Sequence, residues 1–404
     1  MDKIIVVGGG ASGLVAAISA ARCGNDVVIL EKNNSCGKKI LVTGNGKCNY
    51  FNENLDSSHY DSYDKSLIKN IINIKNKQMV LDFFNSIGII PNIKNDYYYP
   101  HSNQAITIIN ALLSELKNLG VQIINNTKVL KIEKKDNDFI LETNNNKYKG
   151  TKVIIATGCY AYYNEDDVNS YNLIKKINHT IIKPLPALVQ LKMDNNICKK
   201  WAGVRITSNI KLYENNKYIK EETGELMLTS YGISGICAMQ LSGLIAKGLS
   251  QSKKEEIVIN FIPDIATNKK ELQSFLDKYN KNHNYKVKEI CDNLINYKLG
   301  NAINSRINEL YYNNLTSKEK NELINNLINY KVNIIGTNSY KEAQTCSGGI
   351  PLNEINLKTM ESLKIKNLYF TGEIIDINGD CGGYNLAFAW ISGLLAGGAT
   401  NDKN

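Results

Sequence analysis

Three glycines near the N-terminus have the spacing of a dinucleotide-binding turn. Gly8, Gly10 and Gly13 follow an apolar β-branched run at residues 4–7 in the order G-x-G-x-x-G, and Glu31 ends a second apolar run. The first glycine permits a tight turn, the second leaves room for a pyrophosphate beside the backbone, and the third lets helix and strand pack closely. Glu31 can accept hydrogen bonds from ribose hydroxyls and would repel a 2′-phosphate, so FAD or NAD fits better than NADP. We therefore predict a dinucleotide site, rather than a glycine-rich turn of an ordinary α/β protein.

The elements that must position these residues can be read on either side of the turn. Residues 4–7 form a run without polar interruption, which is typical of a strand buried on both faces. An alanine-rich helix is expected from about Ser12 to Cys23, and Gly24 is its expected C′ residue. The start of this helix would offer free N–H groups and the positive end of its dipole to phosphates.

Composition limits the classes of protein that fit. A chain of 404 residues usually forms two or three domains. The net charge of +9 is spread as single lysines, so nucleic-acid binding is not expected. Nine cysteines without a C-x-x-C pair favour reduced thiols and a cytoplasmic location. No signal-peptide layout and no apolar run of membrane length are present, no metal site is predicted, and the oligomeric state stays open.

Several blocks resemble one family of flavoproteins. Residues 37–49, G-K-K-I-L-V-T-G-N-G-K-C-N, are similar to the G-[RK]-K-[LIV]-x-[IVT]-[ST]-G-x-G-[RK]-C-N block of the BaiN/YhiN-like flavoproteins. That family is usually described as NAD(P)/FAD-dependent oxidoreductases, and some members have been labelled aminoacetone oxidases. Residues 224–235, 343–350 and 372–390 resemble further family blocks; the second of these, A-Q-T-C-S-G-G-I, is similar to A-x-x-T-x-G-G-[IV].

The resemblance implies an FAD site assembled from segments far apart in the chain. The strand that ends in Ala156-Thr157-Gly158 would return to the FAD, and the backbone near Val129 would meet the adenine. The acid Glu373 would bind ribitol hydroxyls, and a glycine-rich helix start would face the flavin N1–C2=O edge. Together with the N-terminal motif, the expected FAD contacts are Gly8, Gly10, Ala11, Ser12, Gly13, Glu31, Lys32, Lys39, Thr43, Gly44, Asn45, Gly46, Cys48, Asn49, Val129, Ala156, Thr157, Gly158, Gly372, Glu373, Asp376, Gly382, Gly383, Tyr384 and Asn385.

The chain also departs from the family pattern. After Gly158 the family has a second glycine and a Ser-Tyr-Pro turn, whereas this chain has Cys159 followed by a different sequence to Asp167. Ser230 stands where the family has histidine, and Ile236 where it has proline. Because the departure after Gly158 falls where a substrate-side loop is expected, the relatives' substrates are not assumed for this chain.

The expected fold is α/β, a Rossmann-like FAD-binding fold of the two-dinucleotide-binding-domain type with two insertions. We expect the FAD-binding domain at residues 1–186 and 353–404, and a β-rich inserted domain at residues 187–262 and 331–352. A helical insert of four helices is expected at residues 263–330, because Leu and Ile recur there at helical spacing. Residues 127–150 read as a β-meander, and residues 67–74 as an amphipathic helix. A small-molecule substrate is expected between the cofactor domain and the β-rich domain.

The resemblance suggests reduction of an activated C=C bond, which needs a hydride from flavin N5 and a proton donor. Tyr231 and Tyr384 are the main candidate donors, and Tyr160, Tyr162 and His101 are further candidates. NAD(P)H is a transient electron donor in this hypothesis, although a single G-x-G-x-x-G leaves no dedicated nicotinamide site visible. Two cysteines, at positions 36 and 48, lie near the first ribose acid but lack the C-x-x-x-x-C spacing of a redox disulfide.

Two alternatives of other classes remain open. The same fold type could oxidise an amine and pass electrons to oxygen. It could also belong to a non-catalytic flavoprotein, such as a redox sensor or a tRNA-associated protein, although a strongly basic nucleic-acid surface is not evident in the sequence.

Overall fold

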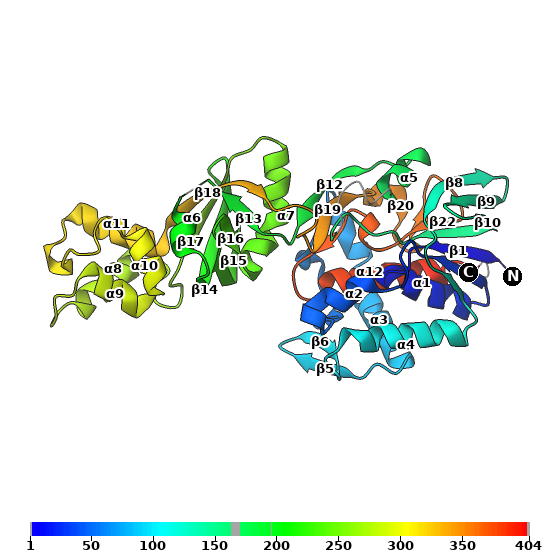
Figure 1. Cartoon of the computed structure of the whole chain (residues 1–404), viewed down its shortest axis with the longest axis horizontal. Helices are drawn as coiled ribbons and strands as arrows, with labels where there is room; N and C mark the ends of the chain where they lie inside the picture. Colours follow the sequence, from blue (N-terminus) through cyan, green and yellow to red (C-terminus); the bar gives the residue numbers. More distant parts are fainter. Residues whose placement is uncertain (1, 163–169, 195, 402–404) are drawn as a thin grey trace. The chain divides into compact units, whose positions relative to one another are not determined.

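The computed structural model describes residues 2–162, 170–194 and 196–401. The chain divides into two compact units (Figure 1), one made of residues 1–184 and 345–404 and the other of residues 185–344. The first unit contains the predicted dinucleotide motif and the second unit is the insertion.

The first unit is built on a mainly parallel sheet with the strand order β20-β21-β22-β11-β1-β2-β7. Strands from β22 to β7 run parallel, and β20 and β21 add an antiparallel edge. Residues 4–7 of β1 are almost completely buried, as predicted for a strand covered on both faces. The bounds are Lys3–Val7 for β1, Asp26–Leu30 for β2, Gln122–Ile124 for β7, Lys152–Ile155 for β11, Ile355–Asn356 for β20, Glu361–Ser362 for β21 and Leu368–Phe370 for β22.

Two helices, α1 (Ala11–Arg22) and α12 (Tyr384–Gly398), pack against each other through glycines. A Cβ atom at Gly393 would lie 2.5 Å from the carbonyl oxygen of Ser12, and one at Gly397 would lie 2.4 Å from that of Ala16. Because Ser12 meets Gly393 and Ala16 meets Gly397, the two helices run in the same direction with their backbones in contact. Their positive N-terminal ends therefore point the same way, which suits an anionic ligand.

Smaller elements complete the first unit. The β-meander predicted at residues 127–150 is present as β8, β9 and β10. The prediction of an amphipathic helix at residues 67–74 is wrong. A short 3₁₀ helix ends at Asn70, and Asn73 caps a separate helix, α3. The bounds are Lys38–Val42 for α2, Ile74–Ser86 for α3, Ala105–Asn118 for α4, Ser170–Lys176 for α5, Phe51–Asn52 for β3, Tyr60–Asp61 for β4, Pro91–Lys94 for β5, Tyr97–Pro100 for β6, Val129–Lys135 for β8, Asp138–Thr143 for β9, Lys147–Gly150 for β10, Ile182–Ala187 for β12, Thr345–Gly349 for β19 and Asn378–Gly379 for β23; the 3₁₀ helices cover Thr43–Gly46, Ser57–His59, Lys65–Asn70, Leu352–Glu354 and Gly372–Ile374.

The second unit contains a closed antiparallel barrel with the strand order β13-β16-β15-β14-β17-β18. Helix α7 (Ile236–Ser250) interrupts the region that we expected to be rich in strands. The other bounds are Leu191–Met193 for β13, Arg205–Glu214 for β14, Lys217–Leu228 for β15, Gly232–Ser234 for β16, Glu255–Asn260 for β17, Tyr330–Thr337 for β18 and Ile197–Trp201 for α6.

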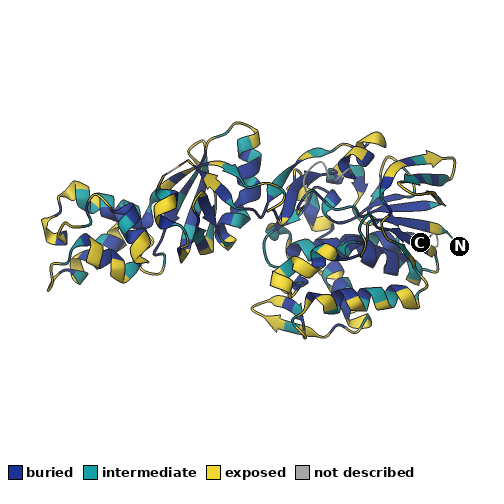
Figure 2. Cartoon of the chain, in the orientation of Figure 1, coloured by how far each residue is buried: buried dark blue, intermediate teal, exposed yellow. Residues whose placement is uncertain are grey.

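Four α-helices and one 3₁₀ helix, Tyr312–Asn314, lie between residues 268 and 330, all of which the structure describes, and the four α-helices agree with the sequence prediction. They are α8 (Lys269–Tyr279), α9 (Val287–Leu294), α10 (Tyr297–Ile303) and α11 (Ser317–Ile328). Their buried side chains belong to the same apolar cluster as the barrel interior, so the helices and barrel share one core. Figure 2 shows this buried interior in dark blue, with exposed residues on the outer faces of the helices. Within the described ranges, no helix combines the length and apolar character needed to cross a bilayer.

Candidate functional site

In the glycine-rich turn after β1, some glycines are needed for close packing of the backbone, and another leaves open space for a ligand. A Cβ atom at Gly8 would lie 2.5 Å from the Ala156 carbonyl oxygen, and one at Gly13 would lie 2.0 Å from the Gly8 carbonyl oxygen. Gly10, the N-cap of α1, has no atom within 4 Å of the position of a Cβ. The close packing expected of Gly13 is therefore present, and the space at Gly10 fits a pyrophosphate at the N-terminus of α1 beside Ala11 and Ser12.

Glu31 is buried at the end of β2 and is oriented by the backbone around it. One carboxylate oxygen accepts a hydrogen bond from the Gly9 N–H at 2.7 Å, and the other accepts from the N–H and side-chain amide of Asn33 at 2.8 and 2.6 Å. The Glu31 carbonyl accepts from the Thr127 N–H, which ties this residue to the segment that leads to Val129 at the start of β8. Glu31 thus lies beside the phosphate turn, where a ribose acceptor is expected, and Lys32 follows it.

The segment from residue 38 to residue 49 is more helical than the phosphate-wrapping loop we expected. It forms α2 and a 3₁₀ turn over Thr43–Gly46, in which Gly44 and Asn45 have left-handed backbone angles. The Thr43 hydroxyl donates to the Ile40 carbonyl, which ends α2. Cys48 is also left-handed and completely buried. The segment therefore returns sharply on itself and brings Asn49 back towards α12.

An ion pair joins two predicted cofactor residues. The Lys39 ammonium lies 2.5 Å from a carboxylate oxygen of Glu373, and both side chains are mostly buried. Burial alone would lower the pKa of Lys39, but the Glu373 carboxylate raises that pKa above its ordinary value. Lys39 is therefore a fixed positive charge, and Glu373 is held where its second oxygen can accept from a hydroxyl.

Buried polar atoms without partners mark where a ligand would bind. The Thr157 hydroxyl and the Asn49 side-chain oxygen are buried and have no hydrogen-bond partner among the described residues. Gly158 is left-handed and has open space at the position of a Cβ. Unsatisfied buried polar groups are costly, so these atoms are expected to bind a polar ligand. The donor and acceptor set, the open glycines and the two helix N-termini fit FAD.

The N-terminus of α12 is formed by Gly382 and Gly383, both with positive φ. A Cβ at Gly383 would lie 2.8 Å from the Phe51 carbonyl oxygen and 2.9 Å from the unpartnered Asn49 oxygen. Asn385 accepts from the Gly379 N–H and donates to its carbonyl, both at 2.8 Å. Only glycine fits at residue 383, and the Asn385 side chain is used to hold the turn that precedes the helix.

Asp376 is satisfied by the protein itself. Its buried carboxylate accepts from the Ser62 hydroxyl at 3.1 Å, from the Tyr63 N–H at 2.7 Å and from the Gly348 N–H at 3.0 Å. Burial raises the pKa of Asp376, and these hydrogen bonds oppose the rise. Its role in the structure is to join β19 to the segment after β4.

The two candidate proton donors lie in different units. Tyr384, at the start of α12, is 5% exposed and stacks on His59 with a ring separation of 4.5 Å. Its backbone carbonyl accepts a hydrogen bond from the Tyr60 hydroxyl. Burial, with a smaller contribution from Asp380, raises the pKa of Tyr384 to about 12. Tyr231 belongs to the second unit, is 40% exposed, and its hydroxyl accepts from the Asn338 amide at 3.3 Å.

The other donors considered lie in the first unit. Tyr160 packs edge-on against Tyr171, Tyr162 lies beside the Lys39 ammonium, and His101 is exposed just after β6. The divergent segment from Cys159 to Asp167 is only partly described, because residues 163–169 lie outside the described ranges.

The cysteines near Glu31 are neutral thiols. Burial raises the pKa of Cys36 to about 12, with help from the Glu31 carboxylate, and burial raises that of Cys48 to about 12 against a hydrogen bond from Thr43. Both are free thiols. Such thiols are poor nucleophiles, so the structure gives no support to a redox pair at these two positions.

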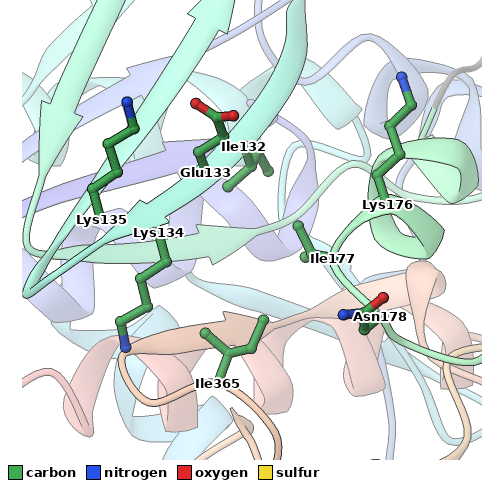
Figure 3. A pocket seen from close by; sticks show the side chains of 8 residues that line it. All are labelled: Ile132, Glu133, Lys134, Lys135, Lys176, Ile177, Asn178 and Ile365. Atoms are coloured by element: carbon green, nitrogen blue, oxygen red, sulfur yellow. The ribbon is translucent and has the colours of Figure 1, made fainter.

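A shallow cavity of about 340 Å³ lies elsewhere on the first unit, between β8 and the end of α5 (Figure 3). Lys135 and Lys176 extend from opposite sides of it, and the Lys134 ammonium donates to the Lys366 carbonyl at 2.7 Å. None of the residues that line it is a predicted cofactor residue. Among the described residues no group of three or more His, Cys, Asp or Glu side chains could hold a metal ion.

The structure adds site residues that sequence reasoning missed. The Thr345 and Tyr171 hydroxyls are buried and unpartnered among the described residues, like the Thr157 hydroxyl. Ser392 accepts from the Gly372 N–H at 2.9 Å, and the Thr371 hydroxyl donates to the Ser12 hydroxyl at 3.1 Å. A signal existed for Thr345, which precedes Cys346 in a family-like block; the other contacts depend on tertiary packing.

Comparison with known proteins identifies the family of the chain. The model of the HI0933-like protein Rossmann domain matches residues 2–399. The chain is 34% identical over 415 residues to a 3-dehydro-bile acid Δ4,6-reductase of Clostridium scindens, covering 100% of both chains. It is 26% identical to a ribosomal RNA dihydrouridine synthase of Escherichia coli, covering 96% of this chain and 95% of that protein.

Two solved structures share the fold. A flavocytochrome c3 fumarate reductase in an open conformation matches with a TM-score of 0.50 at 16% identity, covering 100% of this chain and 79% of that chain. A 3-ketosteroid-Δ4-(5α)-dehydrogenase from Rhodococcus jostii matches with a TM-score of 0.50 at 12% identity, covering 100% and 97%. The expected Rossmann FAD-binding fold with a β-rich insertion is confirmed, and the chain is an FAD-dependent oxidoreductase that belongs to the HI0933-like family.

Proposed function

We propose that this oxidoreductase reduces a carbon–carbon double bond conjugated to a carbonyl group in a small organic substrate. The observation that carries the proposal is what its relatives have in common. One is named for reducing the Δ4,6 bonds of a 3-dehydro-bile acid, and another is named for making dihydrouridine, in which a ring double bond beside a carbonyl is saturated. The substrates differ greatly in size, but the bond that is reduced has the same chemical character.

When bound, FAD would supply the hydride from flavin N5. The residues of this chain would orient it. The N-terminus of α1 at Gly10 would receive the pyrophosphate, and Glu31 would accept from the adenosine ribose. Glu373, fixed by Lys39, would accept from the ribityl chain. The free N–H groups at the start of α12, after Gly383, would stabilise negative charge on the flavin pyrimidine ring.

The substrate also needs a proton on the carbon next to its carbonyl. The Tyr384 hydroxyl is protonated at neutral pH, as a donor must be, although burial beside Asp380 raises its pKa and makes it a weaker acid than an exposed tyrosine. Tyr231 presents its hydroxyl at the surface of the second unit, held by Asn338. Both remain our candidates, and replacing each by phenylalanine removes only the hydroxyl.

The first test is an anaerobic stopped-flow measurement on the purified yellow protein. We expect NADH or NADPH to bleach the flavin absorbance, and a 3-keto-4-ene steroid or bile acid to restore it with formation of the saturated ketone. Bleaching without reoxidation by any conjugated enone would contradict the proposed reaction. No bleaching with either nucleotide, together with rapid reduction by amines and peroxide release in air, would favour the amine-oxidase alternative.

The tyrosines are tested in the same apparatus. A phenylalanine variant at the true proton donor should slow flavin reoxidation by the enone at least about a hundredfold, the lower end of general acid catalysis. Flavin reduction by the nucleotide should stay as in the unmodified protein. If Tyr384→Phe and Tyr231→Phe both reoxidise at the normal rate, neither tyrosine is the donor.

Reduction of uridine in RNA is the second candidate, favoured by the two dihydrouridine synthases among the relatives, at 26% and 24% identity. The barrel offers little to an RNA phosphate backbone, because Arg205, Lys211 and Lys220 each pair with a neighbouring glutamate. Incubation of the reduced protein with ribosomal RNA, followed by nucleoside mass spectrometry, tests this candidate. Dihydrouridine formation without any enone reduction would replace the small-molecule proposal.

A further inference from the structure

A histidine and an aspartate from distant segments meet just before α12. His59 ends the short 3₁₀ helix Ser57–His59, and its Nδ1 lies 3.1 Å from a carboxylate oxygen of Asp380. The Asp380 N–H also donates to the His59 carbonyl at 2.9 Å. The two residues are therefore joined by a side-chain hydrogen bond and a backbone hydrogen bond.

Further contacts fix this pair against the first residue of α12. The His59 ring stacks on the Tyr384 ring, with the ring centres 4.5 Å apart and the planes inclined by 20°. The neighbouring Tyr60 hydroxyl donates to the Tyr384 carbonyl at 2.8 Å, and Tyr60 pairs with Gly379 where β4 meets β23. The imidazole is therefore held in one orientation beside the N-terminus of α12.

The second ring nitrogen of His59 is left available. A carboxylate only accepts hydrogen bonds, so Nδ1 carries the hydrogen of the bond to Asp380. Nε2 is then the nitrogen that gains and releases a proton, and it has no hydrogen-bond partner among the residues that the structure describes. The side chain is 37% exposed, so the ring can take up a proton from water. Histidine is also the residue type whose charge ordinarily changes near neutral pH.

The pair borders the glycine turn that we assign to the flavin ring. A Cβ at Gly382 would lie 3.5 Å from Cε2 of Tyr384, so the ring on which His59 stacks lies against this turn. Tyr384 itself is a weak acid, because burial raises its pKa to about 12. The reaction needs a proton at this place, and the half-exposed imidazole is better suited to supply it than the buried phenol.

We propose that His59 is the proton donor in the enone reduction and that Asp380 is its positioning residue. The inference rests on the proposed function and identifies the acid of that reaction. The double bond gains a hydride at the carbon remote from the carbonyl group, and the two electrons of this hydride come from reduced FAD, which becomes oxidised. The N–H bond at Nε2 of His59 breaks, and its proton forms the C–H bond beside the carbonyl group. The neutral ring then takes a proton from water.

The titratable groups that face His59 come from two segments. Asp56 caps the 3₁₀ helix that His59 ends, and Tyr60 follows that helix directly. Asp380 and Tyr384 lie on the segment from β23 to α12. A pH dependence of the reaction can therefore be assigned only if variants of His59, Asp380 and Tyr384 are compared.

The experiment follows reoxidation of the reduced, FAD-saturated protein by a 3-keto-4-ene steroid in an anaerobic stopped-flow apparatus, from about pH 6 to about pH 9. In the unmodified protein the rate should fall as the pH rises and histidine loses its proton. His59→Gln should be at least about a hundredfold slower at about pH 6 and should lose this decline. In His59→Ala, added imidazole should restore part of the rate, which a residue with a purely structural role would not allow.

Two more variants separate donation from positioning. Asp380→Asn keeps an oxygen that accepts from Nδ1 but removes the negative charge, so the decline in rate should move to lower pH. Tyr384→Phe keeps the stacked ring and should reoxidise at the normal rate.

His283→Gln is the matched control, because His283 is an exposed histidine of the second unit that also lies against a tyrosine ring, that of Tyr285 at 5.5 Å. It should behave like the unmodified protein. An unchanged rate and pH dependence in His59→Gln would overturn the inference and leave the proposed function intact. Failure of every conjugated enone to reoxidise the unmodified protein would overturn the proposed function and this inference with it.

Discussion

Alanine at Gly10 and alanine at Gly13 should separate cofactor binding from folding. The two glycines belong to the same motif but have opposite surroundings. A Cβ at Gly13 would lie 2.0 Å from the Gly8 carbonyl oxygen and 3.1 Å from the Ala156 Cβ, whereas a Cβ at Gly10 would meet nothing within 4 Å. Gly10 also has φ −82°, which any residue adopts, so alanine brings no backbone strain there.

The magnitudes follow from these contacts. Overpacking costs about 1–3 kcal/mol, and the better helix propensity of alanine offsets at most about 1 kcal/mol of this at Gly13. The contact at Gly13 is with a backbone atom, so we expect the upper end of the overpacking cost. With about 3 °C of melting temperature per kcal/mol, Gly13→Ala should then melt roughly 6–9 °C lower than the unmodified protein. Gly10→Ala should leave the free energy of unfolding of the apoprotein within about 0.5 kcal/mol of the original. It should weaken FAD binding at least about tenfold, equivalent to about 1.4 kcal/mol, because the methyl group occupies the space of the pyrophosphate.

The assay uses apoprotein for both quantities. Thermal unfolding followed by circular dichroism gives the stability, and quenching of FAD fluorescence on titration gives the Kd. If Gly10→Ala bound FAD with the original Kd, the open space at Gly10 would not be the phosphate site. If Gly13→Ala melted at the original temperature, the close contact of α1 with the turn would not constrain the fold.

Three further perturbations test parts of the structure. Burial, reinforced by Glu214 and opposed by Lys253, raises the pKa of Glu255 to about 7, so the native state binds its proton more tightly than the unfolded state. The stability that this proton contributes is fully present below about pH 4.5 and is lost as the pH rises through 7. Glu255→Gln should therefore flatten the dependence of the denaturation midpoint on pH over this range. An unchanged slope would contradict the raised pKa of Glu255. Asp376→Ala should destabilise even the apoprotein by roughly 2–4 kcal/mol in a urea titration, because the buried Gly348 N–H and the partly buried Tyr63 N–H lose their acceptor. Asp376→Asn, which keeps one oxygen, should lose less, and an apoprotein of unchanged stability would favour a cofactor-binding role for Asp376 over this structural one. Thr316→Ala removes the N-cap of α11, where the hydroxyl accepts from the Glu319 N–H, and should cost about 1 kcal/mol in the same titration; no loss would mean that the capping box is not formed in solution.

Structure was predictable from the sequence where it depends on the types of residues close together in the chain. The G-x-G-x-x-G turn, the strand before it and the helix after it were predictable because close packing at Gly13 and space at Gly10 are properties of a few neighbouring residues. The helices between residues 268 and 330 were predictable for a similar reason, since Leu and Ile recur there at helical spacing and form the buried faces.

Structure was not predictable from short sequence patterns where it depends on packing between distant segments. Helix α7 was missed because its apolar run resembles a buried strand, although Cys237, Leu241 and Ile245 have helical spacing and are all buried. The 3₁₀ helix at Lys65–Asn70 was missed because Asp64 and Asn73 cap two short elements in place of one helix. At the site, the ion pair between Lys39 and Glu373 joins segments that no sequence pattern connects, so only the folded chain reveals it.

The relatives limit where substrate choice can reside. A bile acid and a ribosomal RNA share little except a double bond beside a carbonyl, yet proteins named for acting on them resemble this chain along nearly its whole length. We infer that what they share is the machinery that orients the flavin. In this chain we propose that the parallel helices α1 and α12, with their closely packed glycines, are part of it. We expect substrate choice to come from segments that vary, and this chain differs from the family pattern immediately after Gly158, beginning at Cys159. Exchanging residues 159–170 for those of a relative should thus change which enone reoxidises the flavin without changing the Kd for FAD, whereas a parallel loss of FAD binding would show that the segment belongs to the shared machinery.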